Sequence, residues 1–462
     1  MQRETDTQRL LSEGYRARLL LILLLTSTLS FADRTVFAVV SQVVKQELRF
    51  TDFELGALQG IGFALIYAIA AVPIARVAEH RSRVAIIALS VAAWSVMTAV
   101  SGMATNFLTM LLSRAGVGIG ETGGNAPATS LISDHFPASR RSFANSVFLL
   151  GSPLGALVGS FLGGWVAQHL GWRMAFYVLA APGAIIAIAV ILGLREPPRG
   201  LADGKPAPTT APPSLWKAFR YLIAKPTFSL ATIAASLAAV GMSSVSQWMV
   251  PFLSRTYHLG VQTTAQFYGI ITFIALSSGL LLGGLLGDRL GRADGRWQNW
   301  APAIGVALAV PLYDGAFVQR HLWGAVALLL LGGFSLFIYF APTVACIQNM
   351  AAPRMRASAA ALFGLLFSTS GPGFGPTIMG YFSDRYAQRL FKLGDFATAC
   401  KGVTHENVSP TLSSACAIAS AEGLRDAFIT VITSAFCLSA LFFMLASLTI
   451  RRDAYKAEQI DA

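Results

Sequence analysis

The sequence predicts an all-α membrane protein with twelve transmembrane helices arranged as two six-helix halves. The chain has 462 residues, of which 54% are hydrophobic and only 13% are charged. That charged fraction is about half of what a soluble domain carries. Apolar runs of about twenty residues recur along the chain, each long enough to cross a hydrocarbon core of roughly 30 Å. Two short patterns also recur in the second half, each after the equivalent run.

This composition excludes several classes of protein. A mean hydropathy of +0.59 does not fit a soluble enzyme or a nucleic-acid-binding domain. The long apolar runs also differ from the alternating ten-residue strands of outer-membrane barrels. Since the chain is a membrane protein, its net charge of +12 is informative through the positions of the basic residues in the loops. The four cysteines form no CxxC pattern or Cys/His cluster, so we expect neither a metal site nor a cofactor.

Run length places twelve spans along the chain. Their expected boundaries are 19–43, 54–77, 84–103, 107–133, 143–168, 173–194, 227–253, 267–287, 300–318, 322–349, 358–383 and 425–449. Because the count is even, both termini lie on one side of the membrane. Most lysines and arginines outside the spans fall on that side. The positive-inside rule therefore predicts two cytoplasmic termini in an inner or plasma membrane.

A central linker separates the two halves. We expect a cytoplasmic tail at 1–18, a six-helix bundle at 19–194, a cytoplasmic linker at 195–226, a second bundle at 227–450 and a cytoplasmic tail at 451–462. The proline-rich middle of the linker is typical of extended or disordered chain. Its end, SLWKAFRYLIA, gathers apolar residues on one face. This favours a short helix at the membrane surface or, equally, a cytosolic extension of the seventh span.

The two halves carry matching patterns after equivalent spans. ARVAEHRSR follows the second span and GLLGDRLGR follows the eighth, so that Ala75 corresponds to Gly284 and Glu79 to Asp288. In the same way, PASRRSFA follows the fourth span and PRMRASA follows the tenth. Two matches of this kind indicate an internal duplication, which is typical of secondary transporters.

These features resemble the major facilitator superfamily over essentially the whole chain. GLLGDRLGR is similar to the superfamily signature between the second and third spans of each half. The first-half copy departs from that signature, because Ala75, Glu79 and His80 replace its glycine, aspartate and arginine. The GWR sequence before the sixth span is similar to another common feature. The resemblance implies the twelve-helix major facilitator fold.

A narrower resemblance is to the spinster branch, whose animal members export sphingosine phosphate and lysophospholipids. It rests on FADR in the first span, RAGVGIGE in the fourth and GDRLGRADGRW after the eighth. The anion:cation symporters, which move sugar acids and related anions, have a similar DR and GE pattern. The resemblance therefore implies a lysolipid or sphingolipid substrate, with a small organic anion or sugar acid as the alternative.

Four charged residues lie inside predicted spans, namely Asp33, Arg34, Arg114 and Glu121. A charge in the hydrocarbon region costs about 2.5–3.5 kcal/mol on insertion scales, and such residues are functional by default. Seven residues separate Arg114 from Glu121, which returns Glu121 to nearly the same face of the helix. A stripe of glycines in the same span should pack against a neighbouring helix. The two charges are then expected to point away from that contact, into a cavity.

Counting residues along the first and fourth spans places Asp33 at roughly the depth of Arg114, with Glu121 nearer the midplane. We therefore expect Asp33, Arg114 and Glu121 to form one cluster for proton coupling or substrate binding. Arg114 can pair with either carboxylate, and the unpaired one becomes the proton acceptor because burial disfavours its charged form. We expect Glu121 to hold a proton while Arg114 pairs with Asp33. The alternative is an inert salt bridge that fixes helix packing. Arg34 either binds an anionic head group or faces a neighbouring helix.

Weaker patterns suggest two further groups of residues. In the resembling family, the charges after the second and eighth spans latch the halves on the cytoplasmic side. This implies a latch made by Glu79, Arg83, Asp288, Arg289 and Arg292. Polar and aromatic side chains could line a cavity for an amphipathic ligand or make ordinary helix contacts. These are Tyr67, Ser243, Gln247, Trp248, Tyr268, Phe337, Tyr339 and Thr343.

Cys400 and Cys416 fall in the long loop between the eleventh and twelfth spans. The predicted topology places this loop outside the cytoplasm, where an oxidising space favours a disulfide between them. Cys346 and Cys437 lie within spans and should be free.

Together these patterns predict a proton-coupled secondary transporter that works by alternating access and moves an amphipathic anion such as a lysolipid or sphingolipid. Its partners would be this small-molecule or lipid substrate, protons and the lipid bilayer. We expect a monomer that binds no nucleic acid. A transporter-like receptor or scaffold is the alternative from another class, but it would need no titratable cluster. The sequence has no GxSxG, HExxH or P-loop, so no enzymatic activity is expected.

Overall fold

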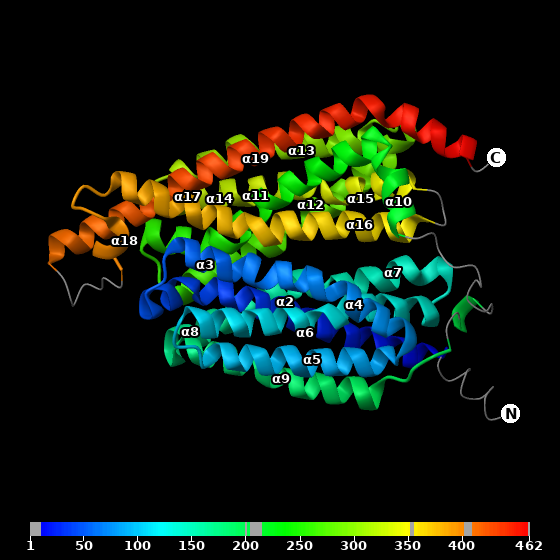
Figure 1. Ribbon diagram of the computed structural model, residues 1–462, viewed down its shortest axis with the longest axis horizontal. Coiled ribbons are helices and arrows are strands. Elements are labelled where there is room, and N and C mark those ends of the chain that lie inside the picture. The colour runs from blue at the N-terminus through cyan, green and yellow to red at the C-terminus, as the bar shows by residue number, and fades with distance from the viewer. Residues whose placement is uncertain (1–10, 199–200, 204–214, 352–354, 402–408, 461–462) are drawn as a thin grey trace. The chain divides into compact units, whose positions relative to one another are not determined.

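The computed structural model describes residues 11–198, 201–203, 215–351, 355–401 and 409–460, apart from some side chains within helices. In this part of the chain every regular element is a helix (Figure 1). Contacts divide the chain into two units. Unit 1 consists of the chain up to Val44, Gly62–Thr210 and Gly260–Gly269. Unit 2 consists of Lys45–Ile61, Ala211–Leu259 and Ile270 onward.

The helices follow one another along the chain with short connections. The first half contains α2 (Glu13–Leu48), α3 (Asp52–Gln59), the π-helix η1 (Ile61–Leu65), α4 (Ile66–His80), α5 (Arg83–Gly102), α6 (Phe107–His135), α7 (Ala138–Leu149), α8 (Gly151–Leu170) and α9 (Trp172–Gly193). The linker contains the 3₁₀ turn η2 (Leu201–Asp203) and α10 (Leu215–Ile223).

The second half is built in the same way. It contains α11 (Pro226–Tyr257), α12 (Val261–Ala293), α13 (Trp297–Val318), α14 (Leu322–Phe337), α15 (Phe340–Asn349), α16 (Arg356–Ser368), the π-helix η4 (Thr369–Phe374), α17 (Gly375–Leu390), α18 (Phe396–Ala399) and α19 (Pro410–Ile460).

Each of the twelve expected spans coincides with a helix or a run of consecutive helices. Ten helical segments of the described chain are long and apolar enough to cross a membrane. The other two expected spans, 107–133 and 358–383, fall on α6 and on the run from α16 to α17. These two are less apolar, because α6 contains Arg114 and Glu121 and the second run is broken by the π-helix TSGPGF. The all-α membrane class is therefore confirmed.

Polar caps and one glycine set the boundaries of several helices. Thr51 begins α3 and Asn106 begins α6, each through a capping box, which satisfies backbone N–H groups that a helix start leaves free. Gly171 separates α8 from α9 with a φ of 89°, a conformation that glycine adopts at no steric cost. In the linker, α10 ends before α11 begins at Pro226. The end of the linker is therefore a separate helix and not an extension of the seventh span.

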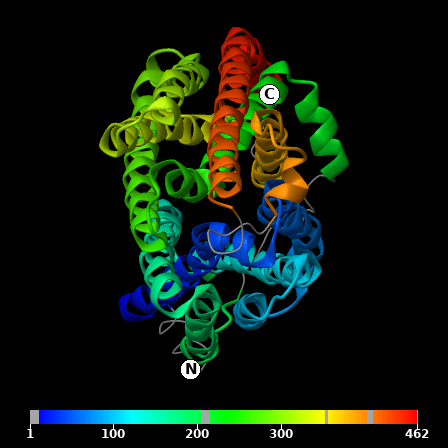
Figure 2. The ribbon, with the colours of Figure 1, turned by 90° about the vertical axis from the view of Figure 1, so that its left-hand side faces the viewer.

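In unit 1, α5 packs against both α6 and α9, and α4 packs against α6 (Figure 1). Viewed from the side, the helices of each unit lie beside one another as a bundle (Figure 2). The expected glycine stripe of α6 faces α5. A Cβ at Gly116 would meet the Met97 side chain, and a Cβ at Gly120 would meet the backbone of Trp94. The predicted close packing of this stripe against a neighbouring helix is confirmed.

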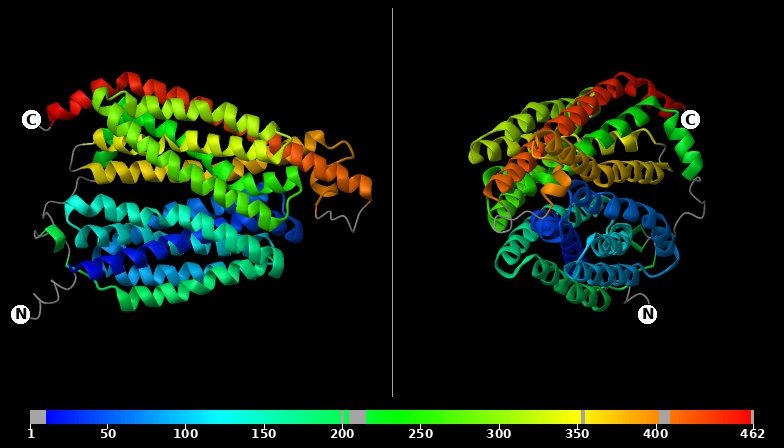
Figure 3. Two further views of the ribbon diagram at one scale, coloured as in Figure 1. Left: turned by 180° about the vertical axis from the view of Figure 1, so that it is seen from behind. Right: turned by 60° about the vertical axis from the view of Figure 1, so that its left-hand side comes forward.

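In unit 2, the long helix α19 packs along α11 and α13 (Figure 3). An aromatic cluster fills the space between these helices. Phe317 stacks on Phe428 at 4.2 Å between ring centroids, and Phe252 meets both rings edge-on. Near α18, Cys400 and Cys416 form a disulfide with a Cα–Cα distance of 5.5 Å, as expected, and Cys346 and Cys437 are free.

The contact between α6 and α5 generates a paired test. In the Gly120→Ala variant the new Cβ would lie 2.7 Å from the backbone nitrogen of Trp94, so the helices must separate at a cost of about 1–3 kcal/mol. At Gly124 the nearest atom would be 3.8 Å away, an ordinary contact. We expect Gly120→Ala to lower the melting temperature of the purified protein and Gly124→Ala to leave it nearly unchanged. Equal melting temperatures for the two variants would contradict this packing.

Candidate functional site

An ion pair joins α2 to α6 inside unit 1. Arg34 Nε donates a hydrogen bond to Glu121 Oε2 at 2.6 Å, and Arg34 Nη2 pairs with the same oxygen. The Glu121 side chain is fully buried, whereas 28% of the Arg34 side chain is exposed. Arg34 is therefore the member of the pair that a ligand could reach.

Three aromatic rings surround Arg34. Its guanidinium carbon lies 5.2 Å from the ring centroid of Phe31, 5.0 Å from that of Phe63 and 5.4 Å from that of Tyr67. Such contacts contribute about 0.5–2 kcal/mol each, depending on desolvation. They also fix the orientation of the guanidinium. The Tyr67 hydroxyl accepts a hydrogen bond from Asn125 Nδ2 at 3.4 Å, which adds a polar edge to this aromatic box.

Arg114 occupies a different environment. Its guanidinium carbon lies 4.8 Å from the ring centroid of Phe37 and 5.1 Å from that of Phe63, and the residue is only 3% exposed. Among the described residues, Nε and Nη1 of Arg114 have no hydrogen-bond partner. A buried cation without direct partners is costly, so its charge is balanced only at longer range.

Asp33 is a fully buried carboxylate without an arginine partner in the described structure. Its Oδ2 accepts a hydrogen bond from Thr98 Oγ1 on α5 at 3.2 Å. Its Oδ1 has no hydrogen-bond partner, and neither does Oε1 of Glu121. The two carboxylates of the cluster are therefore only partly satisfied by hydrogen bonds.

The expected pairing of Arg114 with Asp33 or Glu121 is wrong for this conformation, because Arg34 takes the glutamate. Arg34 is about 100° around α2 from Asp33, which turns it towards α6. Of the two possibilities for Arg34, contact with the neighbouring helix is observed, whereas binding of an anionic head group stays a prediction. Phe31, Phe63 and Thr98 also belong to the site but were not predicted from the sequence. The three- and four-residue spacings Phe31–Arg34 and Phe63–Tyr67 were the available signal.

Arg83 connects three segments of unit 1 through ion pairs and hydrogen bonds. Its Nη1 pairs with Asp134 at the end of α6 and donates to Ser130 Oγ at 2.8 Å, while its Nε donates to Glu196 Oε1 at 2.7 Å. Arg83 is only 1% exposed. Partial burial raises the pKa of Glu196, but the hydrogen bonds it accepts from Arg83 and from the Val84 N–H outweigh this, and the pKa lies below its ordinary value.

The latch between the two halves stays a prediction. The side chains of Glu79, Asp288 and Arg292 lie outside the described residues. Arg289 is exposed, and the contacts of Arg83 given above lie within unit 1.

Some of the residues proposed to line a cavity make helix contacts, and their role in lining a cavity stays a prediction. Trp248 Nε1 donates to the Pro376 carbonyl at 3.0 Å, and Thr343 Oγ1 donates to the Tyr339 carbonyl at 2.7 Å. Ser243, Tyr268 and Tyr339 are buried, Phe337 is half-buried, and Gln247 Oε1 has no partner in the described structure. Of this group, Tyr67 contacts the Arg34 guanidinium and so joins the cluster of unit 1.

A bundle of apolar helices that encloses paired charges and aromatic rings is typical of multi-pass membrane transporters. The sequence profile of the Major Facilitator Superfamily matches residues 23–376. The chain belongs to this superfamily. The match extends over both repeat halves, in agreement with the duplication seen in the sequence.

Known proteins of the spinster branch are among the similar sequences and structures. An MFS-type efflux pump of Mycolicibacterium smegmatis is 30% identical over 80% of this chain and 85% of its own length. The human Protein spinster homolog 1 is 26% identical over 81% of this chain and 74% of its own. A bacterial homolog of the human lysosomal transporter Spinster, solved inward-facing and occupied, has a TM-score of 0.86 and 30% identity, covering 96% of this chain and 99% of its own. The resemblance to the spinster branch is confirmed.

The contacts of Arg83 predict a pH-dependent loss of stability in Arg83→Gln. Removing one partner of a buried ion pair costs about 3–5 kcal/mol, so the melting temperature should fall at pH 7. Because its pKa is lowered in the folded protein, Glu196 contributes stability above its ordinary value of 4.5 and loses that contribution as the pH falls. The difference between variant and wild type should therefore shrink below pH 4.5.

The matched control is Arg81→Gln, which removes an exposed arginine two residues away. This variant should melt at the wild-type temperature both at pH 7 and below pH 4.5. If Arg83→Gln also melts like the wild type at pH 7, Arg83 does not hold these segments together.

Proposed function

We propose that this protein is a proton-coupled secondary transporter that works by alternating access and moves an amphipathic anion such as a lysolipid or sphingolipid. It acts as a monomer in an inner or plasma membrane, with both termini in the cytoplasm. The observation that carries the proposal is the partly exposed Arg34, which is held by aromatic rings and paired with the buried Glu121. The resemblance to spinster proteins and to an efflux pump supports the same class of function.

Arg34 has the properties of a binding residue for an anionic head group. A guanidinium presents several N–H donors in a planar fork that matches carboxylate and phosphate oxygens. The rings of Phe31, Phe63 and Tyr67 around it offer an apolar surface for the hydrocarbon part of the ligand. Ligand sites commonly combine apolar walls with a few orienting polar groups.

Binding of an anion at Arg34 would couple to proton binding at Glu121. Both groups compete for the same guanidinium, so an anion that takes Arg34 leaves Glu121 without its partner. A fully buried carboxylate without a partner is too costly to remain charged, and Glu121 then takes up a proton. Anion and proton therefore bind together.

Asp33 is the second acceptor of the cluster. It has no arginine partner in the described structure and is fully buried, so its neutral form is favoured while Glu121 is paired. Of the two carboxylates that the sequence places here, Asp33 holds the proton before the anion arrives. Arg114, between Phe37 and Phe63, supplies a fixed positive charge to both.

A sugar acid or another small organic anion is the alternative substrate. The Tyr67 ring lies beside Arg34, and its hydroxyl contacts the Asn125 amide. These two polar groups could bind the hydroxyl groups of such a ligand. Uptake into proteoliposomes of a lysolipid panel and a sugar-acid panel, with and without a pH gradient, distinguishes the two. A receptor or scaffold would transport neither panel.

The Glu121→Gln variant tests proton coupling. Glutamine cannot take up a proton, so transport driven by a pH gradient should fall more than tenfold, while the anion still binds to Arg34. The measurement is uptake and equilibrium binding in the same liposomes. The control is Glu422→Gln, which changes a partly exposed carboxylate on α19 and should transport normally. Wild-type transport with an unchanged pH dependence in Glu121→Gln would show that the ion pair is only structural.

Two substitutions of Arg34 test anion recognition. Arg34→Ala removes the charge and should weaken binding at least tenfold. Arg34→Lys keeps the charge but loses the planar fork and its ring contacts, so its affinity should lie between those of the wild type and Arg34→Ala. Binding of a fluorescent lysolipid to purified protein measures this order. If both variants bind as the wild type does, the anion binds elsewhere.

A further inference from the structure

A second cluster of charges lies in unit 2, where α3 packs against α17. The two helices approach closely at glycines. A Cβ at Gly56 would clash with the Pro376 carbonyl, one at Gly60 with the Gly373 carbonyl, and one at Gly380 with the Asp52 carbonyl. We call this packing the α3–α17 contact.

Asp52, the first residue of α3, binds cations from two other helices. Its Oδ1 accepts hydrogen bonds from Lys45 Nζ at 2.5 Å and from Arg255 Nη2 at 2.7 Å. Its Oδ2 accepts from Arg255 Nη1 at 2.7 Å and from Ser383 Oγ at 2.6 Å. Asp52 is 2% exposed, and its charge is compensated by these contacts.

Asp384 on α17 is a second carboxylate at the same place, but its partners are backbone groups. Its Oδ1 accepts a hydrogen bond from the Asp52 N–H at 3.1 Å, and its Oδ2 accepts from the Phe53 N–H at 2.7 Å. It thus caps the N-terminus of α3 from another helix, where the helix dipole favours an acceptor. In the described structure it forms no ion pair with a lysine or arginine of its own.

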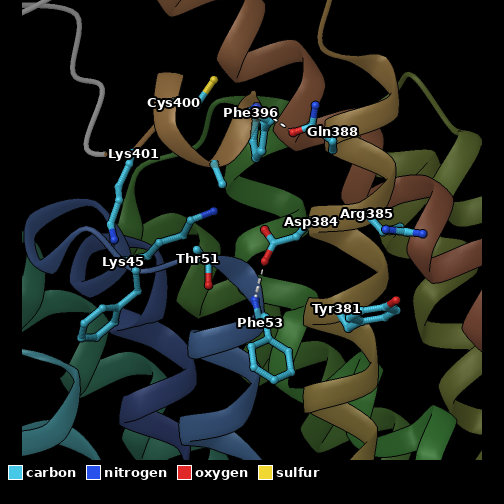
Figure 4. A pocket seen from close by; sticks show the side chains of 12 residues that line it. Lys45, Thr51, Phe53, Tyr381, Asp384, Arg385, Gln388, Phe396, Cys400 and Lys401 are labelled. Atoms are coloured by element: carbon cyan, nitrogen blue, oxygen red, sulfur yellow. Dashed lines mark hydrogen bonds between the residues drawn. The ribbon is translucent and has the colours of Figure 1, made fainter. Parts of the chain in front are cut away.

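Asp384 is also accessible. It lines a cavity of about 240 Å³ together with Lys45, Thr51, Phe53, Gln388 and Lys401, and Figure 4 shows its carboxylate facing the start of α3. Protons can therefore reach this carboxylate through the cavity while α3 and α17 remain packed together.

We propose that Asp384 is a proton-binding site in addition to Asp33 and Glu121, and that proton uptake there strengthens the α3–α17 contact. A protonated Asp384 is neutral and no longer repels Asp52, and its carbonyl oxygen can still accept the Phe53 N–H. An ionised Asp384 is a second negative charge beside Asp52, and in the described structure it forms no ion pair with a lysine or arginine.

The sign of this effect follows from proton linkage. Burial and the negative charge of Asp52 raise the pKa of Asp384 to about 6, although Lys45 and the two N–H donors oppose this. When α3 separates from α17, Asp384 is no longer buried beside Asp52, and its pKa returns towards the ordinary value of 3.8. The packed form therefore binds the proton more strongly, and the contact gains stability as the pH falls through about 6. Between pH 8 and pH 5 the gain is about tenfold in the equilibrium.

The other charged groups that face Asp384 come from several elements. They are Lys45 from α2, Asp52 from α3, Arg255 from α11 and Lys401 after α18, while Arg385 of the same helix points away in Figure 4. None of the residues that line the cavity is a histidine, the residue that ordinarily titrates near pH 6.

Two features of α3 favour its separation from α17. The chain leaves unit 2 directly after α3, within the π-helix η1, and π-helical turns are frequent at functional sites. Both side-chain polar atoms of Gln59, at the end of α3, are buried without a partner in the described structure. Burying these polar atoms without a hydrogen bond costs free energy, and that cost would be removed when α3 separates and water reaches the amide.

Hydrogen–deuterium exchange of the full-length protein, purified without substrate, tests the inference. Labelling times at pH 5 and pH 8 are scaled for the intrinsic exchange rate, and a peptide from α5 is the internal reference. We expect the α3 peptide to be about tenfold better protected at pH 5, with a midpoint near pH 6. Because no substrate is present, the result does not depend on the proposed transport function.

Asp384→Asn imitates the protonated form, and it should keep α3 protected equally well at both pH values. The control is Asp395→Asn, which changes the exposed N-cap of α18 and should retain the wild-type pH dependence. A flat wild-type profile would overturn the proposal without any variant. The same holds if the pH dependence persists in Asp384→Asn, or if that variant is unprotected at both pH values.

Discussion

The arrangement of this protein depends on the cost of a charge that is buried away from water. An unpaired ion in a low-dielectric interior is unstable by several kcal/mol, so it must find a partner or change its protonation state. In unit 1, Glu121 is paired with Arg34, whereas Asp33 has a single hydrogen bond from Thr98. The two carboxylates therefore differ in how their charge is compensated, although they have the same chemistry.

The same cost separates the two aspartates of unit 2. Asp52 is stabilised by Lys45 and Arg255, while Asp384 is stabilised by two backbone N–H groups. Backbone donors at a helix start favour an anion, but they provide no full positive charge. A carboxylate held in this way stays close to the balance between its charged and neutral forms. The Arg34–Glu121 cluster and the Asp52 cluster thus each contain one carboxylate paired with an arginine and one without an ion-pair partner in the described structure.

The sequence was sufficient to predict the spans, the glycine stripe of α6 and the four membrane-embedded charges, because each is a property of local periodicity. It could not predict which arginine binds Glu121. A helical period fixes which residues share a face, but the rotation of α2 relative to α6 is set by packing. The cluster around Asp52 was missed for a similar reason. Arg255 and Asp384 lie far in the sequence from Asp52, and no spacing links them to it.

Arg34 and Arg114 differ in their environments, and this difference would allow the cluster to bind the proposed ligand and remain stable. Arg114 is enclosed by Phe37 and Phe63 and is 3% exposed, so it supplies a constant positive potential. Arg34 is fixed by rings on its faces, yet part of its guanidinium side chain is exposed. In the proposed mechanism, an anion that reaches Arg34 replaces Glu121 as its partner, and the charge of the protein interior stays balanced only if Glu121 becomes neutral. Such coupling would require no large movement of the cluster, because the anion and Glu121 would compete for one guanidinium.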